Sequence, residues 1–139
     1  MTPLPRRRIQ VVAQEIAALD LLSGGRVIFG AGIGGVAAEF ERFGEDPDLR
    51  RRAVMFEEGL PLLARLLEGE RVDHRGQFYT ARDVQIAPLP LQRPRPPFWV
   101  GAIRGPARRR AARSEGWTIP NAGRDGSPIN APPQIAAQV

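Results

Sequence analysis

The first regular pattern along the chain is a helical stripe of apolar residues. Between Arg6 and Leu22, apolar side chains recur at steps of three and four residues, which places them on one side of a helix. The members of this stripe are Ile9, Val12, Ala13, Ile16, Leu19 and Leu22. Ser23-Gly24-Gly25 follows, and glycine readily adopts the left-handed conformation that ends helices. We predict a helix over Arg6–Leu22, preceded by Met1–Pro5 as a loop leaving a strand.

Three short apolar runs have the character of buried strands. Arg26–Gly30 and Phe98–Ala102 contain β-branched and aromatic residues, and Gly116–Ile119 is a third run of the same kind. Continuous apolar runs of this length are typical of strands that are covered on both faces, as in parallel sheets. The sequence therefore predicts a strand in each of the first two runs, and leaves open whether Gly116–Ile119 begins a third.

Further helices are predicted between these strands. Val36–Phe43 is a short helix or ordered loop, and Arg104–Arg113 is a helix after the second strand. A longer helix runs from Asp46 to about Glu68, because acids and proline suit the start of a helix. Pro61 lies inside it and predicts a kink or a split, since proline has no backbone N–H.

The segment between the long helix and the second strand predicts a β-hairpin. Its strands are Arg71–His74 and a return from Gln77–Tyr79, with a turn at Arg75-Gly76, all within Gly69–Ile86. Pro88–Pro97 follows and predicts an extended, polyproline-like segment.

The order of these elements predicts the fold class. Short apolar strands that alternate with helices form parallel β/α units. A parallel sheet needs several strands and cover on both faces, so two or three strands do not complete one. Residues 121–139 add only a loop and the start of a helix. We therefore expect a chain that is cut at both ends and leaves open sheet edges, which favour self-association.

Composition excludes several kinds of site. The 139 residues include no Cys and one His, His74, which excludes disulfides, thiolate metal sites and sites that need two histidines. We expect no metal. No apolar run approaches the ~20 residues of a membrane span, and the amphipathic first helix is not a signal peptide. We expect a cytoplasmic protein that contacts no membrane.

The positive charge is weak evidence for an anionic partner. All 20 basic residues are Arg, which indicates codon bias more than selection, and the net charge is +5. The triplets Arg6–Arg8, Arg50–Arg52 and Arg108–Arg110 would bind nucleic acid only if they converged on one face. We expect solvated helix positions and no nucleic acid, and keep an Arg-rich nucleic-acid binder as a third hypothesis.

A glycine-rich turn follows the first predicted strand. Gly30–Gly35 matches the pattern G-x-G-x-x-G, in which missing Cβ atoms let backbone amides approach a phosphate. A dinucleotide fold also needs an acid about 20 residues later at the end of a second strand, where this sequence predicts helix. Three interpretations stay open: a dinucleotide site, a turn without ligand, and a flavin-type phosphate or ring contact in another α/β fold.

Several motifs carry a family resemblance over about Leu4–Pro120. They are Leu19–Arg26 (LDLLSGGR), Gly30–Gly35, Glu39-Phe40, Phe43-Gly44, the helix Arg52–Leu67, Arg75–Tyr79 (RGQFY), Pro88–Gly101 and Gly116-Trp117. In order and spacing they resemble the luciferase-like flavin-dependent monooxygenases, a family that includes deazaflavin-dependent enzymes. The resemblance implies that residues 1–139 are one partial domain, of which residues 1–120 match the family.

That resemblance implies a (β/α)8 TIM barrel, which needs about 250 residues. The chain would supply only the central β/α units, from the end of the third strand through the fifth, with the hairpin as an insertion. The family binds FMN or the deazaflavin coenzyme F420 at the carboxyl ends of the strands. Thr2 and Pro3 would lie near the cofactor ring.

Two loops are expected to bind the cofactor. The glycine turn contributes Gly30, Gly32 and Gly34, and Ile33 stands where some members place a phosphate-binding Arg. The loop after the fifth strand is the expected phosphate cradle, and its residues are Gly101, Ala102, Ile103, Arg104 and Gly105. A helix N-terminus and an Arg there suit an anion physically as well.

No residue stands out as an acid, base or nucleophile. We expect His74 to be a solvated turn residue rather than a general base. Glu57 and Glu58 face different sides of their helix and are expected to cap or to form ion pairs. Trp99 and Trp117 are expected to pack in the core rather than to stack on a ring.

Two functions follow for the chain. The first is a fragment of a luciferase-like oxidoreductase that uses reduced FMN or F420 on a small organic substrate, either inserting one oxygen from O2 or passing a hydride. The cofactor would carry the redox chemistry. The second is a catalytically inactive truncated fragment or association module, a possible homo-oligomer through its open sheet edges.

Overall fold

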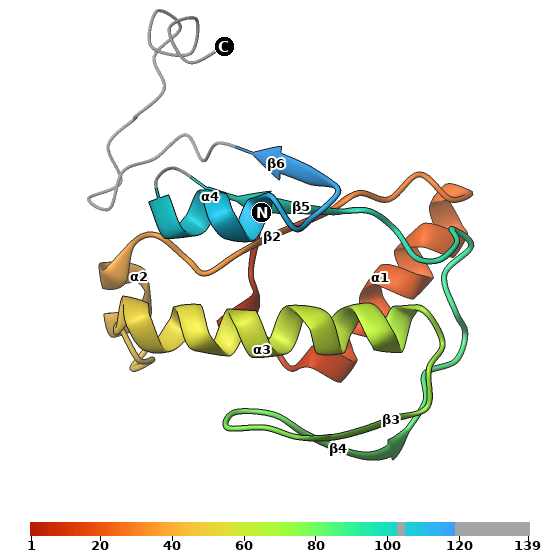
Figure 1. Cartoon of the computed structure of the whole chain (residues 1–139), viewed down its shortest axis with the longest axis horizontal. Helices are drawn as coiled ribbons and strands as arrows, with labels where there is room; N and C mark the ends of the chain where they lie inside the picture. The colour runs from red at the N-terminus through yellow and green to blue at the C-terminus, as the bar shows by residue number, and fades with distance from the viewer. Residues whose placement is uncertain (103–104, 119–139) are drawn as a thin grey trace, which may run out of the picture.

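Four short strands lie side by side in the computed structural model, which describes residues 1–102 and 105–118 (Figure 1). Their order across the sheet is β1 (Thr2–Pro3), β2 (Phe29–Gly32), β5 (Phe98–Gly101) and β6 (Gly116–Thr118). Every neighbouring pair is parallel. The predicted α/β class with a parallel sheet is therefore confirmed. The loop and helix expected over 121–139 lie outside the described residues.

The strand register separates the sheet into two faces. Phe29 pairs with Phe98 and Ala31 pairs with Val100, and all four residues are buried. The two phenylalanine rings meet edge to face with their centroids 5.5 Å apart. Because side chains alternate along a strand, the residues between these four point to the opposite face.

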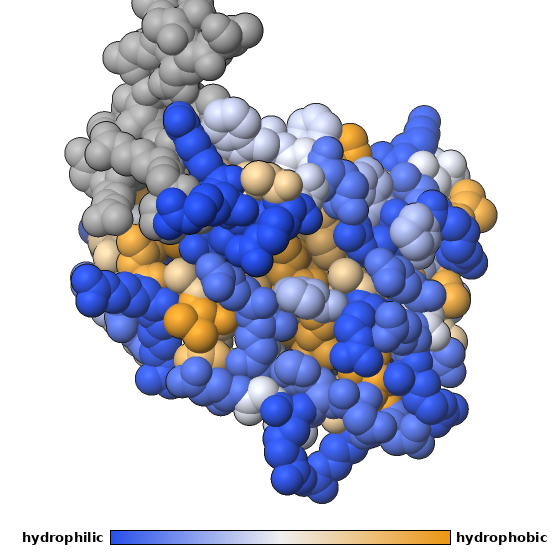
Figure 2. Space-filling view, viewed as in Figure 1, coloured by the Kyte–Doolittle hydropathy of each residue, from blue (hydrophilic) through white to orange (hydrophobic). Residues whose placement is uncertain are grey.

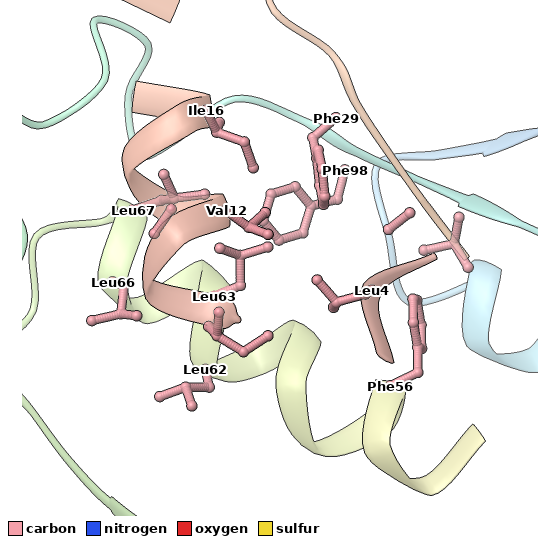
Figure 3. Close-up of a cluster of buried hydrophobic side chains, with 14 of the residues drawn as sticks. Leu4, Val12, Ile16, Phe29, Phe56, Leu62, Leu63, Leu66, Leu67 and Phe98 are labelled. Carbon is pink, nitrogen blue, oxygen red and sulfur yellow. The ribbon is translucent and has the colours of Figure 1, made fainter. Parts of the chain in front are cut away.

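Helices α1 (Ile9–Ser23) and α3 (Leu49–Leu67) cover the phenylalanine-bearing face. Their buried side chains and those of the strands form one apolar cluster (Figure 3). α1 begins later than predicted, after a 3-10 turn over Leu4–Arg6, because Arg8 is extended and takes the N-cap position. It ends as predicted, with Gly24 left-handed at a φ of 68°.

Helix α3 follows the predicted pattern except at Pro61. Its N-cap is Asp48, whose side chain accepts a hydrogen bond from the Arg50 N–H at 2.8 Å. The helix continues unbroken through Pro61, so the predicted split is wrong. Proline removes only the bond that its own N–H would donate to the Glu57 carbonyl. Burial of the leucines that follow it holds the next turn in place.

The remaining elements agree with the predicted order. α2 (Ala37–Glu41) is the short helix after β2, and α4 (Gly105–Ala111) follows β5. β3 (Val72–Arg75) and β4 (Thr80–Val84) form a separate antiparallel pair beside α3 (Figure 1). The predicted hairpin is therefore confirmed, although its return strand begins at Thr80 and Gln77–Tyr79 lies in the turn.

The position of β2 corrects the predicted first strand and glycine turn. A strand was expected over Arg26–Gly30, with a turn over Gly30–Gly35, whereas β2 extends to Gly32. Pairing with β5 decides the position, since the Phe29 N–H donates to the Pro97 carbonyl at 2.9 Å and the ladder continues from there. Gly30 and Gly32 are therefore strand residues, and Gly34 lies in the turn beyond them.

The proline-rich segment is not one polyproline helix. It bends at residues 87–88 and 91–94, and the peptide bonds before Pro88 and Pro94 are cis. The fully buried carboxylate of Asp20 accepts hydrogen bonds from the Gln92 backbone N–H at 2.8 Å and from its side-chain amide at 2.7 Å. The same amide donates to the Val27 carbonyl at 2.8 Å. These bonds tie the segment to the end of α1 and the approach to β2.

Helix length and polarity also bear on membrane contact. α3 has 19 residues and carries arginines and glutamates along its length. Within residues 1–102 and 105–118, no helix is both long and apolar enough to cross a membrane.

Candidate functional site

The face of the sheet opposite α1 and α3 carries few side chains. Trp99 pairs with Gly30 on one side and Gly116 on the other, so these three form one row across the sheet. Gly32 and Gly101 lie on the same face, nearer the carboxyl ends of β2 and β5. We call this surface the glycine face (Gly30, Gly32, Trp99, Gly101 and Gly116). Trp99 projects from it with 41% of its surface exposed.

The Met1 side chain lies across the glycine face. A Cβ at Gly101 would clash with its sulfur, and a Cβ at Gly32 would lie 3.4 Å from that sulfur. A Cβ at Gly116 would clash with the Trp99 indole. Glycine at these positions therefore lets the Met1 and Trp99 side chains lie directly against the sheet, where any other residue would displace them.

The strands of this sheet contain no titratable side chain. Their residues are Thr-Pro in β1, Phe-Gly-Ala-Gly in β2, Phe-Trp-Val-Gly in β5 and Gly-Trp-Thr in β6. The glycine face thus offers shape, an aromatic ring and backbone groups, and no acid or base. Such a surface suits a planar bound group that brings its own chemistry.

The carboxyl ends of β2 and β5 meet at one edge of the sheet. Gly34 follows β2 and Ala102 follows β5, while Pro3 of β1 pairs with Gly32. Of the predicted ring-side residues, Pro3 therefore shares a row with Gly32 on the glycine face, whereas Thr2 pairs with Ala31 of the opposite face. Ile103 and Arg104 of the predicted phosphate cradle lie outside the described residues.

The backbone of Ala102 is already engaged. Its N–H donates to the Thr118 carbonyl at 3.0 Å, and its carbonyl accepts from the Trp117 indole N–H at 2.7 Å. Its methyl is buried. Any anion held at this edge must therefore use other groups, such as those at the start of α4, where Gly105 is the first residue.

The turn after β2 is held by an aromatic ring. Gly34 has a φ of 78°, a left-handed conformation that favours glycine, and a Cβ there would clash with the Phe40 ring. Phe40 is buried, and the Arg52 guanidinium carbon lies 3.6 Å from its ring centroid. The Arg6 guanidinium also approaches Phe40, at 4.9 Å. These contacts fix the position of the turn beside the glycine face.

Arg52 corrects the expectation that all three arginine triplets are solvated. It is 2% exposed, and its Nη2 donates to the Pro47 carbonyl at 3.2 Å. Burial lowers the pKa of Arg52, and the carboxylates of Asp46 and Asp48 oppose that shift. Arg6 also departs from the expectation, because it lies in the 3-10 turn before α1. The loop before α3 folds over Arg52, which a helical pattern alone does not reveal.

Glu58 organises the hairpin turn. Its carboxylate accepts hydrogen bonds from the backbone N–H groups of Gln77, Phe78 and Tyr79, the last at 2.8 Å. Burial raises the pKa of Glu58, but the hydrogen bonds from His74 and these amides outweigh it and leave the pKa lowered. Glu57 pairs with Arg110 at 3.2 Å. The predicted ion-pair role is confirmed for Glu57, whereas Glu58 binds the backbone of the hairpin turn and caps no helix.

His74 is not the solvated turn residue that was expected. It lies in β3, its side chain is 24% exposed, and its Nε2 lies 3.0 Å from the Glu58 Oε1. The Glu58 carboxylate draws the ring onto α3, which a local reading of the hairpin does not include. His74 belongs to the two-stranded sheet β3-β4, which is separate from the sheet that carries the glycine face.

The two tryptophans are also placed differently from the expectation. Trp99 is 41% and Trp117 is 45% exposed, so neither is a core residue. Trp99 stands on the glycine face, over which the described chain places no helix. Trp117 lies on the other side of the sheet, where the Arg108 guanidinium approaches its ring at 5.5 Å.

Sequence reasoning missed two buried charged residues, Asp20 and Arg52. Both are at most 2% exposed. Burial raises the pKa of Asp20, and hydrogen bonds from Gln92 and Val27 outweigh it, so the pKa is lowered. Asp20 lies one turn after Ile16 on the apolar stripe of α1, and that position on the stripe was the available signal.

The comparisons with known proteins agree with this architecture. The family model described as luciferase-like monooxygenase matches residues 1–131. An F420-dependent glucose-6-phosphate dehydrogenase from Microbacterium testaceum is 32% identical over 125 residues, covering 90% of this chain and 37% of that protein. A limonene 1,2-monooxygenase from Rhodococcus erythropolis is 39% identical over 87 residues, covering 63% and 22%.

A solved structure agrees as well. The monooxygenase RslO1 from Streptomyces bottropensis superposes with a TM-score of 0.65 and 30% identity, covering 73% of this chain and 30% of that one. This chain therefore spans between about a fifth and two fifths of the relatives named here. With a family model that covers nearly all of its residues, the chain belongs to the luciferase-like monooxygenase family, whose members are TIM-barrel oxidoreductases.

Proposed function

We propose that this chain is the central part of a (β/α)8 barrel that binds reduced FMN or F420 and acts on a small organic substrate. The observation that carries the proposal is the pairing of β2 with β5. The two strands are parallel neighbours, and their carboxyl ends bring Gly34 and Gly101 to one edge of the sheet. Active sites of such barrels lie at this edge.

The proposed cofactor site uses the two predicted loops. The ring lies along the glycine face at Gly30 and Gly32, with Gly34 at its border. The phosphate lies at the loop after β5, and the residues proposed to donate to it are Gly101, Ile103, Arg104 and Gly105. Ala102 belongs to the same loop and lines the proposed site without a free backbone N–H. The missing Cβ atoms support the ring position, since they leave the backbone of the sheet open to a flat group where Met1 now lies. Met1 lies against Gly30, Gly32 and Gly101 and must move aside for the ring to reach them.

The cofactor would supply hydride transfer or oxygen activation, and the protein would supply position. Trp99 offers an aromatic surface beside the ring, and the glycine face excludes water from the side that the ring covers. The absence of titratable residues from the four strands fits this division of roles. The relatives include both an F420-dependent dehydrogenase and monooxygenases, so the proposal covers both reaction types.

The proposal can be tested by tryptophan fluorescence. The chain has two tryptophans, so Trp117→Phe leaves Trp99 as the single emitter. Titration with reduced FMN and with F420 should quench Trp99 in a saturable way with at least one of them. Gly101→Val should abolish the quenching, because its side chain would occupy the glycine face.

A matched control is available at Gly35. A Cβ there meets nothing within 4 Å, so Gly35→Ala should leave the titration unchanged. Circular dichroism should show the same helix content in all variants. A folded chain that shows no saturable quenching with either cofactor would overturn the proposed cofactor site.

The second candidate function is an association module without enzyme activity. β1 and β6 are the outer strands of the described sheet, and each has one neighbour within it. Unpaired strand edges favour pairing with another chain. Light scattering after size-exclusion chromatography tests this candidate: it expects a dimer or larger species, and a compact monomer contradicts it.

A further inference from the structure

We infer that two copies of this chain associate and close one eight-stranded barrel, in which the glycine face of each copy covers that of the other. The inference rests on the proposed function, which makes the chain the central part of such a barrel. The four described strands are half of the eight that a (β/α)8 barrel contains. The outer strands β1 and β6 run parallel to β2 and β5, as strands of such a barrel must. A second copy supplies the other four.

The helices show which face of the sheet is the outside. α1 and α3 cover the phenylalanine-bearing face, and α4 joins them there, because its Arg110 pairs with Glu57 of α3 at 3.2 Å. In the described part of the chain, the strands of this sheet follow one another in chain order, without the reversal that would place helices on the glycine face. Figure 2 shows that the face carrying α3 and α4 is mostly hydrophilic, with smaller hydrophobic areas between. Parallel sheets are buried on both faces, and a sheet with helices on one face achieves this by closing into a barrel.

The glycine face supplies half of an interior layer. In a barrel of this kind, each interior layer consists of four side chains from alternate strands. Trp99 projects from β5, and Met1, at the start of β1, lies against Gly30 of β2. Gly30 and Gly116 carry no side chain, so the large residues of this row come from alternate strands, β1 and β5. Two copies would contribute two Met1 and two Trp99 side chains, which make one layer of four.

Closure would bury apolar surface that the single chain exposes. Met1 is 60% and Trp99 is 41% exposed. The four strands carry no titratable side chain, so their burial places no charged side chain of the sheet in the interior. The only backbone N–H in β1 is that of Thr2, because its other residue is Pro3. Burial of side chains, rather than a long ladder of hydrogen bonds, therefore provides most of the free energy of association.

A twofold axis parallel to the strands would relate the two copies. It keeps all eight strands parallel and places β6 of each copy beside β1 of its partner. The two junctions are identical, so the assembly closes and leaves no outer strand to recruit a third copy. The carboxyl ends of β2 and β5, where the cofactor site is proposed, form the open mouth of this barrel.

Light scattering after size-exclusion chromatography of the full chain, without cofactor, tests the closure. We expect a dimer and no larger species as the concentration rises. Trp99→Glu should give a folded monomer, because its carboxylate would be solvated in the single chain and buried in the barrel. Circular dichroism should show unchanged helix content. A monomer of the unmodified chain, or species that grow beyond the dimer with concentration, would overturn the inference.

The matched control is Leu22→Glu, the same kind of change at the end of α1. Leu22 is 85% exposed and lies outside the closed sheet, so this variant should remain a dimer. Loss of the dimer in Leu22→Glu, or a dimer that survives Trp99→Glu, would show association through another surface and overturn the inference.

Fluorescence gives a second readout that does not depend on the folding of Trp99→Glu. In Trp117→Phe, Trp99 is the single emitter, and its quenching by acrylamide should fall as the chain is concentrated from monomer to dimer. A dimer in which acrylamide quenches Trp99 as strongly as in the monomer would contradict the closure. Because no cofactor is present, the two proposals fail separately: a dimer that shows no saturable cofactor binding overturns the cofactor site and leaves the closure standing.

Discussion

The Arg52 guanidinium stacks on the Phe40 ring, with its central carbon 3.6 Å from the ring centroid, and both residues are 2% exposed. Phe40 in turn fills the space that a side chain at Gly34 would need. The first turn of α3 thereby holds the loop that borders the glycine face. The Nε and Nη1 of Arg52 have no hydrogen-bond partner among the described residues, so the aromatic face is a principal favourable contact for this buried charge.

A double-mutant cycle should detect this contact. We expect Arg52→Met and Phe40→Leu to show a coupling energy of about 1–2 kcal/mol, because a desolvated cation gains from the face of an aromatic ring. Urea unfolding of the two single variants and the double variant measures it. Strictly additive changes in the free energy of unfolding would show that the stacking contributes nothing.

Alanine substitutions at Gly34 and Gly44 should distinguish the cost of a left-handed backbone conformation from the cost of a steric clash. Gly34→Ala should destabilise the chain by roughly 2–4 kcal/mol, because it combines a left-handed φ with a clash against Phe40. Gly44 also has a positive φ, 70°, but open space around it, so Gly44→Ala should cost only about 1–2 kcal/mol. Thermal or urea unfolding measures both, and equal costs would argue against the Phe40 contact.

Local sequence patterns predicted where the helices and strands lie better than they predicted which strands pair with one another. The apolar stripe of α1, the capping acid of α3 and the short apolar run of β5 each depend on residues close in sequence, and each was predicted near its observed place. β2 was misplaced, because its limits depend on pairing with β5. That pairing joins segments separated by two helices and a hairpin, and no local pattern contains it.

In the candidate site, too, local features were predicted and features that depend on distant residues were missed. The glycines and the loop after β5 were proposed from sequence motifs, and they remain a prediction. The exposure of Trp99 was not, because it depends on the sheet face that lacks a covering helix. Asp20 was missed because its hydrogen-bond partner Gln92 lies 72 residues away. Arg52 was missed because its burial depends on the loop that precedes α3.

Glu58 gives the fold a defined dependence on pH. The pKa of Glu58 in the folded chain is lowered from the ordinary value of 4.5. At a pH between the lowered pKa and 4.5, the unfolded chain therefore binds more protons than the folded chain. The stabilisation is complete above 4.5 and is lost as the pH falls through the lowered pKa. Glu58→Gln should therefore flatten the acid side of the stability profile and cost about 1–3 kcal/mol at neutral pH.

The control for Glu58 is its neighbour. Glu57 is half-exposed and pairs with Arg110 at 3.2 Å, so Glu57→Gln should change the free energy of unfolding by less than about 1 kcal/mol. Unfolding by urea between acid and neutral pH measures both variants. If Glu58→Gln and the unmodified chain lose stability in parallel on acidification, the carboxylate does not have the role assigned to it.

Asp20 should be essential for the proline-rich segment. Asp20→Ala removes the acceptor for both Gln92 donors, and we expect a loss of about 2–4 kcal/mol because these groups are partly buried. Hydrogen exchange of the Gln92 amide should accelerate with it. Glu15→Ala, which removes a half-exposed acid from the same helix, should cost less than about 1 kcal/mol. Similar losses for the two variants would contradict the anchoring role.

The most direct test of the proposed cofactor site is backbone amide NMR of the full chain during titration with FMN and with F420. The account predicts that the largest shifts fall on Gly30, Gly32, Gly34, Gly101 and Gly105, at the edge where β2 and β5 end. Shifts confined to the helix-covered face of the sheet, or to the hairpin, would contradict it, as would a folded chain whose spectrum neither cofactor changes.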